Sequence, residues 1–299
     1  MPSDKSRRTS YFKQKTRFSL IWNTYLFDRR LRFFLMDAIE RFEIALRCAL
    51  TQTLTAETGT NTPHADLSLF PSMLTVNKKT GKTRYEKWIA GIQAKYDDAG
   101  SYDPRIEHCK TVHAVRDVSH LPIWIVMELT TLGNLKTLYE NLRPDLRTRL
   151  AKLLGVDENF LTSSLILLHQ VRNRCAHHKR VWNYLWLKKT KRNRPLFNHV
   201  PTESEWFFKY EKSSASWIPN SAKTQQEMSF CPKDTVFVFI LCGYWLGQLD
   251  QTSHWKERVE GIVQPNGTIL KNAREAGFCD GWEKHPLWNN RASCANSVD

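Results

Sequence analysis

The chain has 299 residues, of which 41% are hydrophobic, so it is long enough to bury a substantial core in one large domain or two ordinary ones. Lys and Arg outnumber Asp and Glu by 44 to 30, a formal charge of +14. That balance favours a polyanionic partner, RNA or DNA before a membrane surface. Seven cysteines, an odd number, argue against a disulfide framework and for a reducing compartment.

Targeting and membrane signals are absent from the pattern. The N-terminus is basic and polar without an apolar segment after it, so it does not resemble a signal peptide. The longest apolar stretch, near Val236 to Leu246, is broken by Gly243 and is too short to cross a bilayer. We therefore expect a cytoplasmic protein without a membrane anchor.

The N-terminal part predicts a flexible arm followed by a long helix. Residues 1–16 form the expected basic arm, and 17–299 the expected single helical domain. Asp28 is a candidate N-cap for a helix that runs to about Thr55, because apolar residues then recur at steps of three and four. A further helix is expected over Tyr85 to Tyr96.

Short helices are expected in the middle of the chain. Pro122 fits the first turn of one helix, which Gly133 ends. Further helices are expected over Asn134 to Leu142 and over Pro144 to Leu153. Asp157 is then the candidate N-cap of the helix that leads into the most polar motif of the chain.

The C-terminal part changes in composition after Trp186. Residues 188–232 predict a long, loop-rich excursion, followed by helices over Thr235 to Leu249 and roughly Ser253 to Val263. The aromatic residues of the tail are expected to pack back on these helices. No sustained alternation of apolar and polar residues predicts a strand, so the expected fold class is all-α.

Basic clusters occur in two predicted loops. One is a run at the start of the excursion, and the other follows the first long helix; their members are Lys188, Lys189, Lys191, Arg192 and Arg194, and Lys78, Lys79 and Lys82. Lysine and arginine near aromatic residues are typical of surfaces that bind unpaired RNA. We therefore predict that both clusters bind RNA.

The motif stands at the end of an apolar helix. Leu165, Leu168 and Arg172 share one face by steps of three and four, which directs the arginine inward or into a groove. Asn173 and His177 are four residues apart, so the amide is expected to hold the imidazole in one orientation. A plain alternative is that the arginine and histidine only stabilise the C-terminal end of the helix.

Arg172 and His177 suit cleavage of RNA without a metal ion or other cofactor. Histidine titrates near neutral pH and can move a proton to or from the reacting oxygens. Arginine stabilises negative charge on the phosphate. This chemistry needs the ribose 2′-hydroxyl and leaves a cyclic phosphate. One helix supplies one arginine and one histidine, so a homodimer is expected to complete the site.

A zinc site is a weaker alternative. Cys175 and His178 have ligand spacing, and His108, Cys109 and His113 complete a possible set. The two groups lie on separate predicted helices without paired Cys-x2-Cys motifs.

The polar string from Arg172 through Asn183 is more specific than a lone Arg-x4-His spacing. It is accompanied, in order along the chain, by the blocks Phe27–Arg32, Asp37–Arg47, Leu121–Trp124 with Glu128, Gly133 and Asn134, and Gly277–Phe278 with Trp282 and Pro286–Trp288. Together these blocks resemble the Abi family of phage abortive-infection proteins, of the AbiD and AbiF type, within the HEPN superfamily of RNA-cleaving domains. The resemblance covers the chain from Phe27 to Trp288.

This resemblance implies a HEPN-type helical bundle with additional helices and a long basic loop, dimerisation, and an Arg-x4-His site that falls on Arg172 and His177. Asn173 occupies the polar position after the arginine. Residues expected to orient the catalytic groups are Glu40, Glu43 and Arg47 on the first long helix, and His178. Two departures are the short basic arm, where many relatives carry a further helical segment, and the length of the 188–232 excursion.

The leading hypothesis is a toxin-type endoribonuclease of antiphage defence, associated with a structured small RNA. An alternative is a non-catalytic protein that forms a ribonucleoprotein with a noncoding RNA. A DNA-binding regulator is a third, weaker alternative, because the helices around Gly133 superficially resemble helix-turn-helix spacing but have the apolar pattern of a core.

Overall fold

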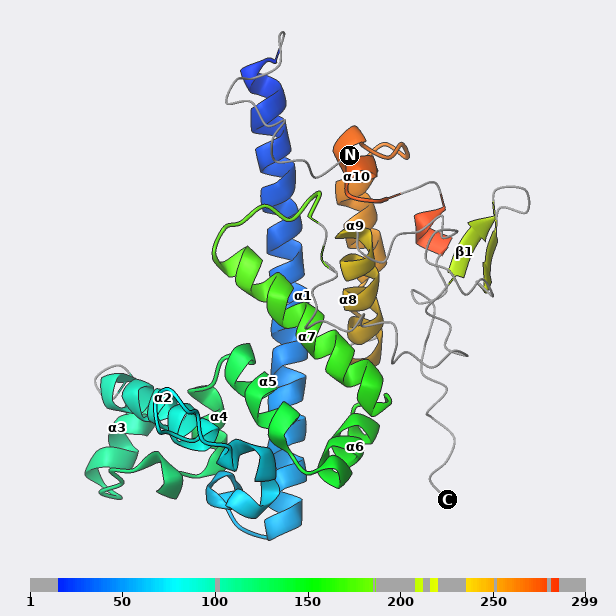
Figure 1. The fold of residues 1–299 in the computed structure, drawn as a ribbon. Helices are drawn as coiled ribbons and strands as arrows, with labels where there is room; N and C mark the ends of the chain where they lie inside the picture. Colours follow the sequence, from blue (N-terminus) through cyan, green and yellow to red (C-terminus); the bar gives the residue numbers. More distant parts are fainter. Residues whose placement is uncertain are drawn as a thin grey trace.

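The computed structural model of the chain describes residues 16–99, 103–184, 186, 208–211, 216–219, 235–249, 252–278 and 281–284. The fold is all-α, as predicted, and is arranged around one long helix, α1 (Phe18–Thr58), which runs the height of the molecule in Figure 1. The helices α7 (Glu158–Ala176) and α8 (Thr235–Leu249) pack against α1 along its middle.

The central helix begins earlier than its sequence predicts. It starts at Phe18, so the prediction that Asp28 is its N-cap is wrong: Asp28 lies inside the helix and is buried. The physical reason is that this carboxylate accepts N–H groups from a distant loop instead of from its own helix. The helix ends at Gly59, whose φ of 67° suits a residue without a side chain.

One face of α1 carries a stripe of apolar side chains that forms part of the core. Its members recur at steps of three and four and are almost inaccessible to solvent: Leu31, Leu35, Phe42, Leu46, Leu50 and Leu54. Burial of such a stripe against several helices, rather than helix propensity, holds the bundle together.

A cluster of short elements lies beside the second half of α1, at the lower left of Figure 1. Its helices are α2 (Arg84–Ala99), α3 (Pro104–Thr111) and α4 (Ile123–Glu128), connected through the 3-10 turns η2 (Pro63–Ala65), η3 (Leu67–Leu69), η4 (Pro71–Leu74) and η5 (Val118–His120). The helix predicted over Tyr85 to Tyr96 is confirmed as part of α2.

The next helices are α5 (Leu132–Asn141) and α6 (Pro144–Leu153). The bounds predicted for α6 are confirmed. Gly133, expected to end a helix, instead lies in the first turn of α5, because Thr131 and Asn134 form a capping box that starts the helix at Leu132, two residues before the predicted start at Asn134. Asp157 is confirmed as the N-cap of α7, where its carboxylate accepts the Phe160 N–H at 2.9 Å.

The C-terminal part contains α8, α9 (Trp255–Val263), α10 (Lys271–Glu275) and the turn η7 (Trp282–Lys284). The tail aromatics Phe278 and Trp282 are buried against the helices, as expected. Between α7 and α8 an antiparallel hairpin joins β1 (Phe208–Glu211) to β2 (Ser216–Pro219) inside the excursion for which no strand was expected. None of the described helices combines the length and the apolarity needed to cross a bilayer.

Candidate functional site at the end of α7

The polar motif occupies the last turns of α7 and the loop after it. Arg172 and Asn173 are half-buried, whereas His177 is exposed at the C-cap position. His178 then adopts a left-handed conformation with φ of 53°, and the Lys179 N–H donates back to the Arg174 carbonyl at 2.9 Å. This is the hydrogen-bond pattern that ends many helices, with histidine in the place usually taken by glycine.

The loop after His178 folds back on the helix that precedes it. The guanidinium of Arg174 donates two hydrogen bonds to the Arg180 carbonyl, at 3.1 and 2.8 Å. The same guanidinium lies 3.6 Å from the centre of the Tyr184 ring. Arg174 therefore has a structural role in fixing the loop that carries both histidines.

Two distant helices anchor the far end of this loop. Asp28 of α1 accepts the backbone N–H groups of Val181 and Trp182, both at 2.8 Å, and pairs with Arg32 one turn along the helix. Thr235, the first residue of α8, donates to the Val181 carbonyl at 2.6 Å. The loop is thus fixed by buried polar contacts from α1 and α8, which explains why an aspartate is needed inside a core-facing helix.

Arg172 lies near charged side chains of both signs. Burial lowers the pKa of Lys95, and the nearby charge of Arg172 lowers it further, while Glu43 opposes the shift. Burial also lowers the pKa of His169, the charges of Lys136 and Arg172 lower it further, and Glu140, which pairs with Lys136, opposes the shift. Within the described part of the chain Arg172 itself forms no ion pair. A half-buried arginine without an acid partner is typical of a site that binds an anion.

Asn173 contacts a different histidine from the one expected. Its side-chain amide donates to Nε2 of His169 at 3.1 Å, one turn earlier in α7, and not to His177. This bond requires a neutral ring with a free lone pair on Nε2, which agrees with the lowered pKa of His169. Gly133 lies against the same ring: a side-chain carbon there would come within 3.0 Å of Nε2.

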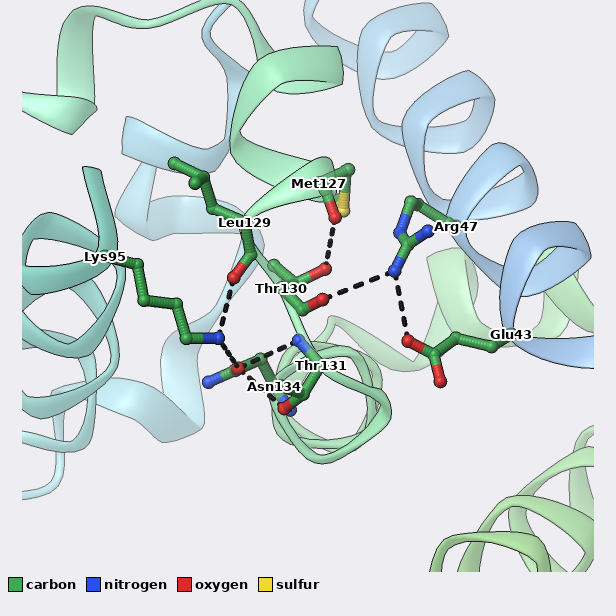
Figure 2. A network of polar contacts seen from close by, with 8 residues as sticks. All are labelled: Glu43, Arg47, Lys95, Met127, Leu129, Thr130, Thr131 and Asn134. Atoms are coloured by element: carbon green, nitrogen blue, oxygen red, sulfur yellow. Dashed lines mark hydrogen bonds and ion pairs between the residues drawn. The ribbon is translucent and has the colours of Figure 1, made fainter. Parts of the chain in front are cut away.

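A polar network joins α1 and α2 to the turn before α5 (Figure 2). Glu43 accepts from Arg47 at 3.0 Å, and Arg47 also donates to the Thr130 carbonyl at 3.3 Å. From the other side, Lys95 donates to the Leu129 carbonyl at 2.7 Å. Arg47 and Lys95 thus bind the short segment between α4 and α5 from two sides. The charge of Arg172 lowers the pKa of Lys95, and that of Glu43 raises it.

The expected orienting residues therefore divide into two sets. Glu43 and Arg47 are half-buried and belong to the network near Lys95. Glu40 is exposed on α1, and His178 lines a cavity between the end of α7 and α1. Neither residue is part of this network. Lys95 and His169 were not predicted as site residues. Their sequence signals were weak, because a lone lysine on an amphipathic helix and a lone histidine near leucines most often have no special role.

The structure describes one of the two basic clusters that were predicted to bind RNA. Lys78, Lys79 and Lys82 are exposed in a tight turn closed by the Asn77 N–H, which donates to the Lys82 carbonyl at 2.9 Å. Lys188, Lys189, Lys191, Arg192 and Arg194 lie outside the described residues.

The alternative zinc set does not come together. Cys175 and His178 line a cavity against α1, whereas His108, Cys109 and His113 line another one against α4. Among the described residues, no group of three His, Cys, Asp or Glu side chains is placed to share a metal ion.

These features define an all-α protein with a fixed, histidine-bearing loop at the end of a helix. Beside this loop lies a half-buried arginine that has no ion pair among the described residues. The chain belongs to the Abi-like protein family, whose match covers residues 1–183 and therefore the whole motif. Membership associates the chain with abortive infection, a form of antiviral defence. No similar protein was found among curated proteins, and none among solved structures.

Proposed function

We propose that this protein is a HEPN-type endoribonuclease of abortive infection that cleaves RNA without a metal ion, through Arg172 and His177. The observation that carries the proposal is the environment of Arg172: half-buried, close to Lys95 and His169, and without an ion pair in the described residues. An RNA phosphate placed there would give Arg172 the anionic partner that it does not have among the described residues.

The proposed chemistry divides the work between two groups. Arg172, assisted by Lys95, binds the phosphate and stabilises the charge that develops on its oxygens during attack by the 2′-hydroxyl. His177 is exposed at the end of α7, so its imidazole is free to reach a bound strand and to transfer a proton. Glu43 and Arg47 hold the segment between α4 and α5 on which Lys95 rests.

The separation of the two groups supports a dimer. Five residues at about 100° each separate two side-chain directions on a helix by about 140°, so one α7 does not direct both groups to one point. A second copy related by a two-fold axis would bring its own His177 to the shared strand. The proposed active form is therefore a homodimer with a composite site.

The test compares purified Arg172→Ala and His177→Ala with the parent on a structured RNA in excess EDTA. We expect each substitution to lower the cleavage rate by about 100-fold or more, because a single acid–base or charge-stabilising group contributes that much. Lys152→Ala, which removes an exposed charge on α6, is the matched control and should cleave like the parent. Circular dichroism and sedimentation confirm that each variant folds and associates.

The alternative of a non-catalytic RNA-binding protein gives a different result in the same experiment. The parent would then bind RNA with a steep salt dependence but release no product, and Arg172→Ala would weaken binding alone. Cleavage by His177→Ala at the parent rate would contradict the catalytic assignment.

A further inference from the structure

The first turns of α1 expose large aromatic side chains. Phe18, Trp22, Tyr25 and Phe33 keep 75%, 48%, 50% and 73% of their surface accessible. The Phe18 and Trp22 rings stack with centroids 6.2 Å apart, and the Trp22 and Tyr25 rings with centroids 5.6 Å apart. Exposing this much aromatic surface in a soluble helix is unfavourable unless a partner covers it. In Figure 1 this end of α1, in dark blue, extends past α7 and α8.

The accessible charge on the same stretch is entirely positive. Arg17, Arg29 and Arg30 are exposed, and the single acid between residues 16 and 36, Asp28, is buried and paired with Arg32. Arg29 is four residues from both Tyr25 and Phe33, so on a helix it lies between these two rings. The surface therefore alternates aromatic rings with arginines that form no ion pair to any residue that the structure describes.

A cavity connects this surface to the motif. It has a volume of about 650 Å³ and is lined by Tyr25, Arg29, Arg30 and Phe33 on α1 and by Cys175 and His178 at the end of α7. A volume of this size accommodates small organic groups such as a nucleobase. Because His178 directly follows His177, a strand that leaves the cavity on this side reaches the histidine assigned to proton transfer.

We propose that this surface, the α1 aromatic ladder (Phe18, Trp22, Tyr25 and Phe33 with Arg29 and Arg30), binds unpaired RNA. The inference rests on the proposed function and names the substrate class as single-stranded RNA next to the cleavage site. Bases stack on the exposed rings, and the guanidinium groups between the rings contact the phosphates. A second copy is the less favourable occupant, because a two-fold contact through this surface would oppose arginine with arginine.

The experiment uses full-length His177→Ala protein, which lacks the proton-transfer group but keeps Arg172, so that bound RNA is not consumed, and a fluorescent unstructured oligoadenylate. Trp22→Ala and Phe33→Ala should each raise the Kd by about 5-fold or more, the loss expected for one stacked base. Trp124→Ala, which removes an aromatic side chain 53% exposed on α4, is the matched control and should not change the Kd. A blunt RNA duplex should bind with the same Kd to all of these proteins, since its bases are not available for stacking.

Charge is tested by a second matched pair. Arg29→Glu should weaken binding of the oligoadenylate and lower its salt dependence. Lys152→Glu on α6 should change neither, although both substitutions replace a positive charge with a negative one. Sedimentation of each variant measures its oligomeric state under the same conditions.

Unchanged Kd values for both Trp22→Ala and Phe33→Ala would overturn the inference, as would failure of the oligoadenylate to bind at all. If these variants become monomers while their RNA affinity is unchanged, the ladder binds a second copy and the inference is again wrong. Cleavage is measured separately with the unsubstituted parent protein. Ladder-dependent binding without cleavage would refute the proposed ribonuclease alone, and cleavage with ladder-independent binding would refute this inference alone.

Discussion

Removal of the Asp28 carboxylate should release the loop that carries His177 and His178. In the native protein one oxygen of Asp28 accepts the N–H groups of Val181 and Trp182, and the other accepts from Arg32. Asp28→Ala would leave the buried Val181 N–H without an acceptor and the Arg32 guanidinium, only 7% exposed, without a counter-charge.

The magnitude follows from these contacts. Breaking a buried ion pair by removing one partner costs about 3–5 kcal/mol, so we expect Asp28→Ala to lower the free energy of unfolding by about 4 kcal/mol. Asp28→Asn keeps an oxygen for both N–H groups but turns an amide NH2, which is a donor, toward the Arg32 guanidinium, so we expect a loss of about 3 kcal/mol. Both values are below the total of about 5–15 kcal/mol typical of a folded domain, so both variants should fold.

Urea unfolding followed by far-UV circular dichroism measures these losses. Asp145→Ala is the control, because Asp145 forms an exposed ion pair with Arg143, and such pairs contribute little to stability. In the absence of urea, limited proteolysis should cut the loop after α7 faster in Asp28→Ala than in the control, and before the helices are cut. An Asp28→Ala variant as stable as the parent would refute the role of Asp28 as the anchor of this loop.

Further predictions concern the same loop and a buried histidine. Thr235→Val removes the donor to the Val181 carbonyl and the acceptor of the Trp186 indole, and should lower the free energy of unfolding by about 2 kcal/mol in urea titrations; an unchanged midpoint would contradict it. His178→Gly relieves a left-handed conformation and should raise stability by about 1 kcal/mol in thermal unfolding, whereas His178→Ala should not. Burial lowers the pKa of His64 below 6.5, so the unfolded chain takes up this proton first and stability falls as the pH decreases below 6.5. His64→Gln should flatten that acid limb by up to about 1.4 kcal/mol per pH unit, and an equally steep limb in the variant would show that His64 is not its origin.

Several elements could be predicted because their signals are local. The bounds of α6 follow from Pro144 and its apolar period, and the cap of α7 follows from Asp157. The α8 segment is apolar on all sides and is buried accordingly. These signals act within a few residues, so one sequence is enough to interpret them.

The misassigned residues are those whose partners are selected only by the folded structure. Asp28 resembles an N-cap until the tertiary structure supplies the N–H groups of Val181 and Trp182, more than a hundred residues away. Asn173 is four residues from both His169 and His177, and helix spacing alone does not choose between them. The structure places His169 beside Asn173, because His177 is already at the end of the helix.

In the candidate site, too, the sequence indicated Arg172 but not the residues that lie near it in the folded structure. The spacing of the motif directs attention to Arg172, but the residues whose pKa values its charge lowers come from α2 and from an earlier turn of α7. No short-range pattern connects Lys95 with Arg172. They come together because α7 packs against α5, while α2 reaches the start of α5 and the segment before it through the hydrogen bonds of Trp88 and Lys95.

The central claim is that Arg172 and His177 cleave RNA through its own 2′-hydroxyl. The most direct measurement incubates the parent protein, in excess EDTA, with a preferred RNA and with the same strand carrying 2′-deoxyribose at the cleaved position, and analyses the ends of the products. We expect cyclic phosphate ends from the RNA, no cleavage at the deoxy position, and no product from His177→Ala. Cleavage of the deoxy strand at the same bond, or activity that requires a divalent cation, would contradict it.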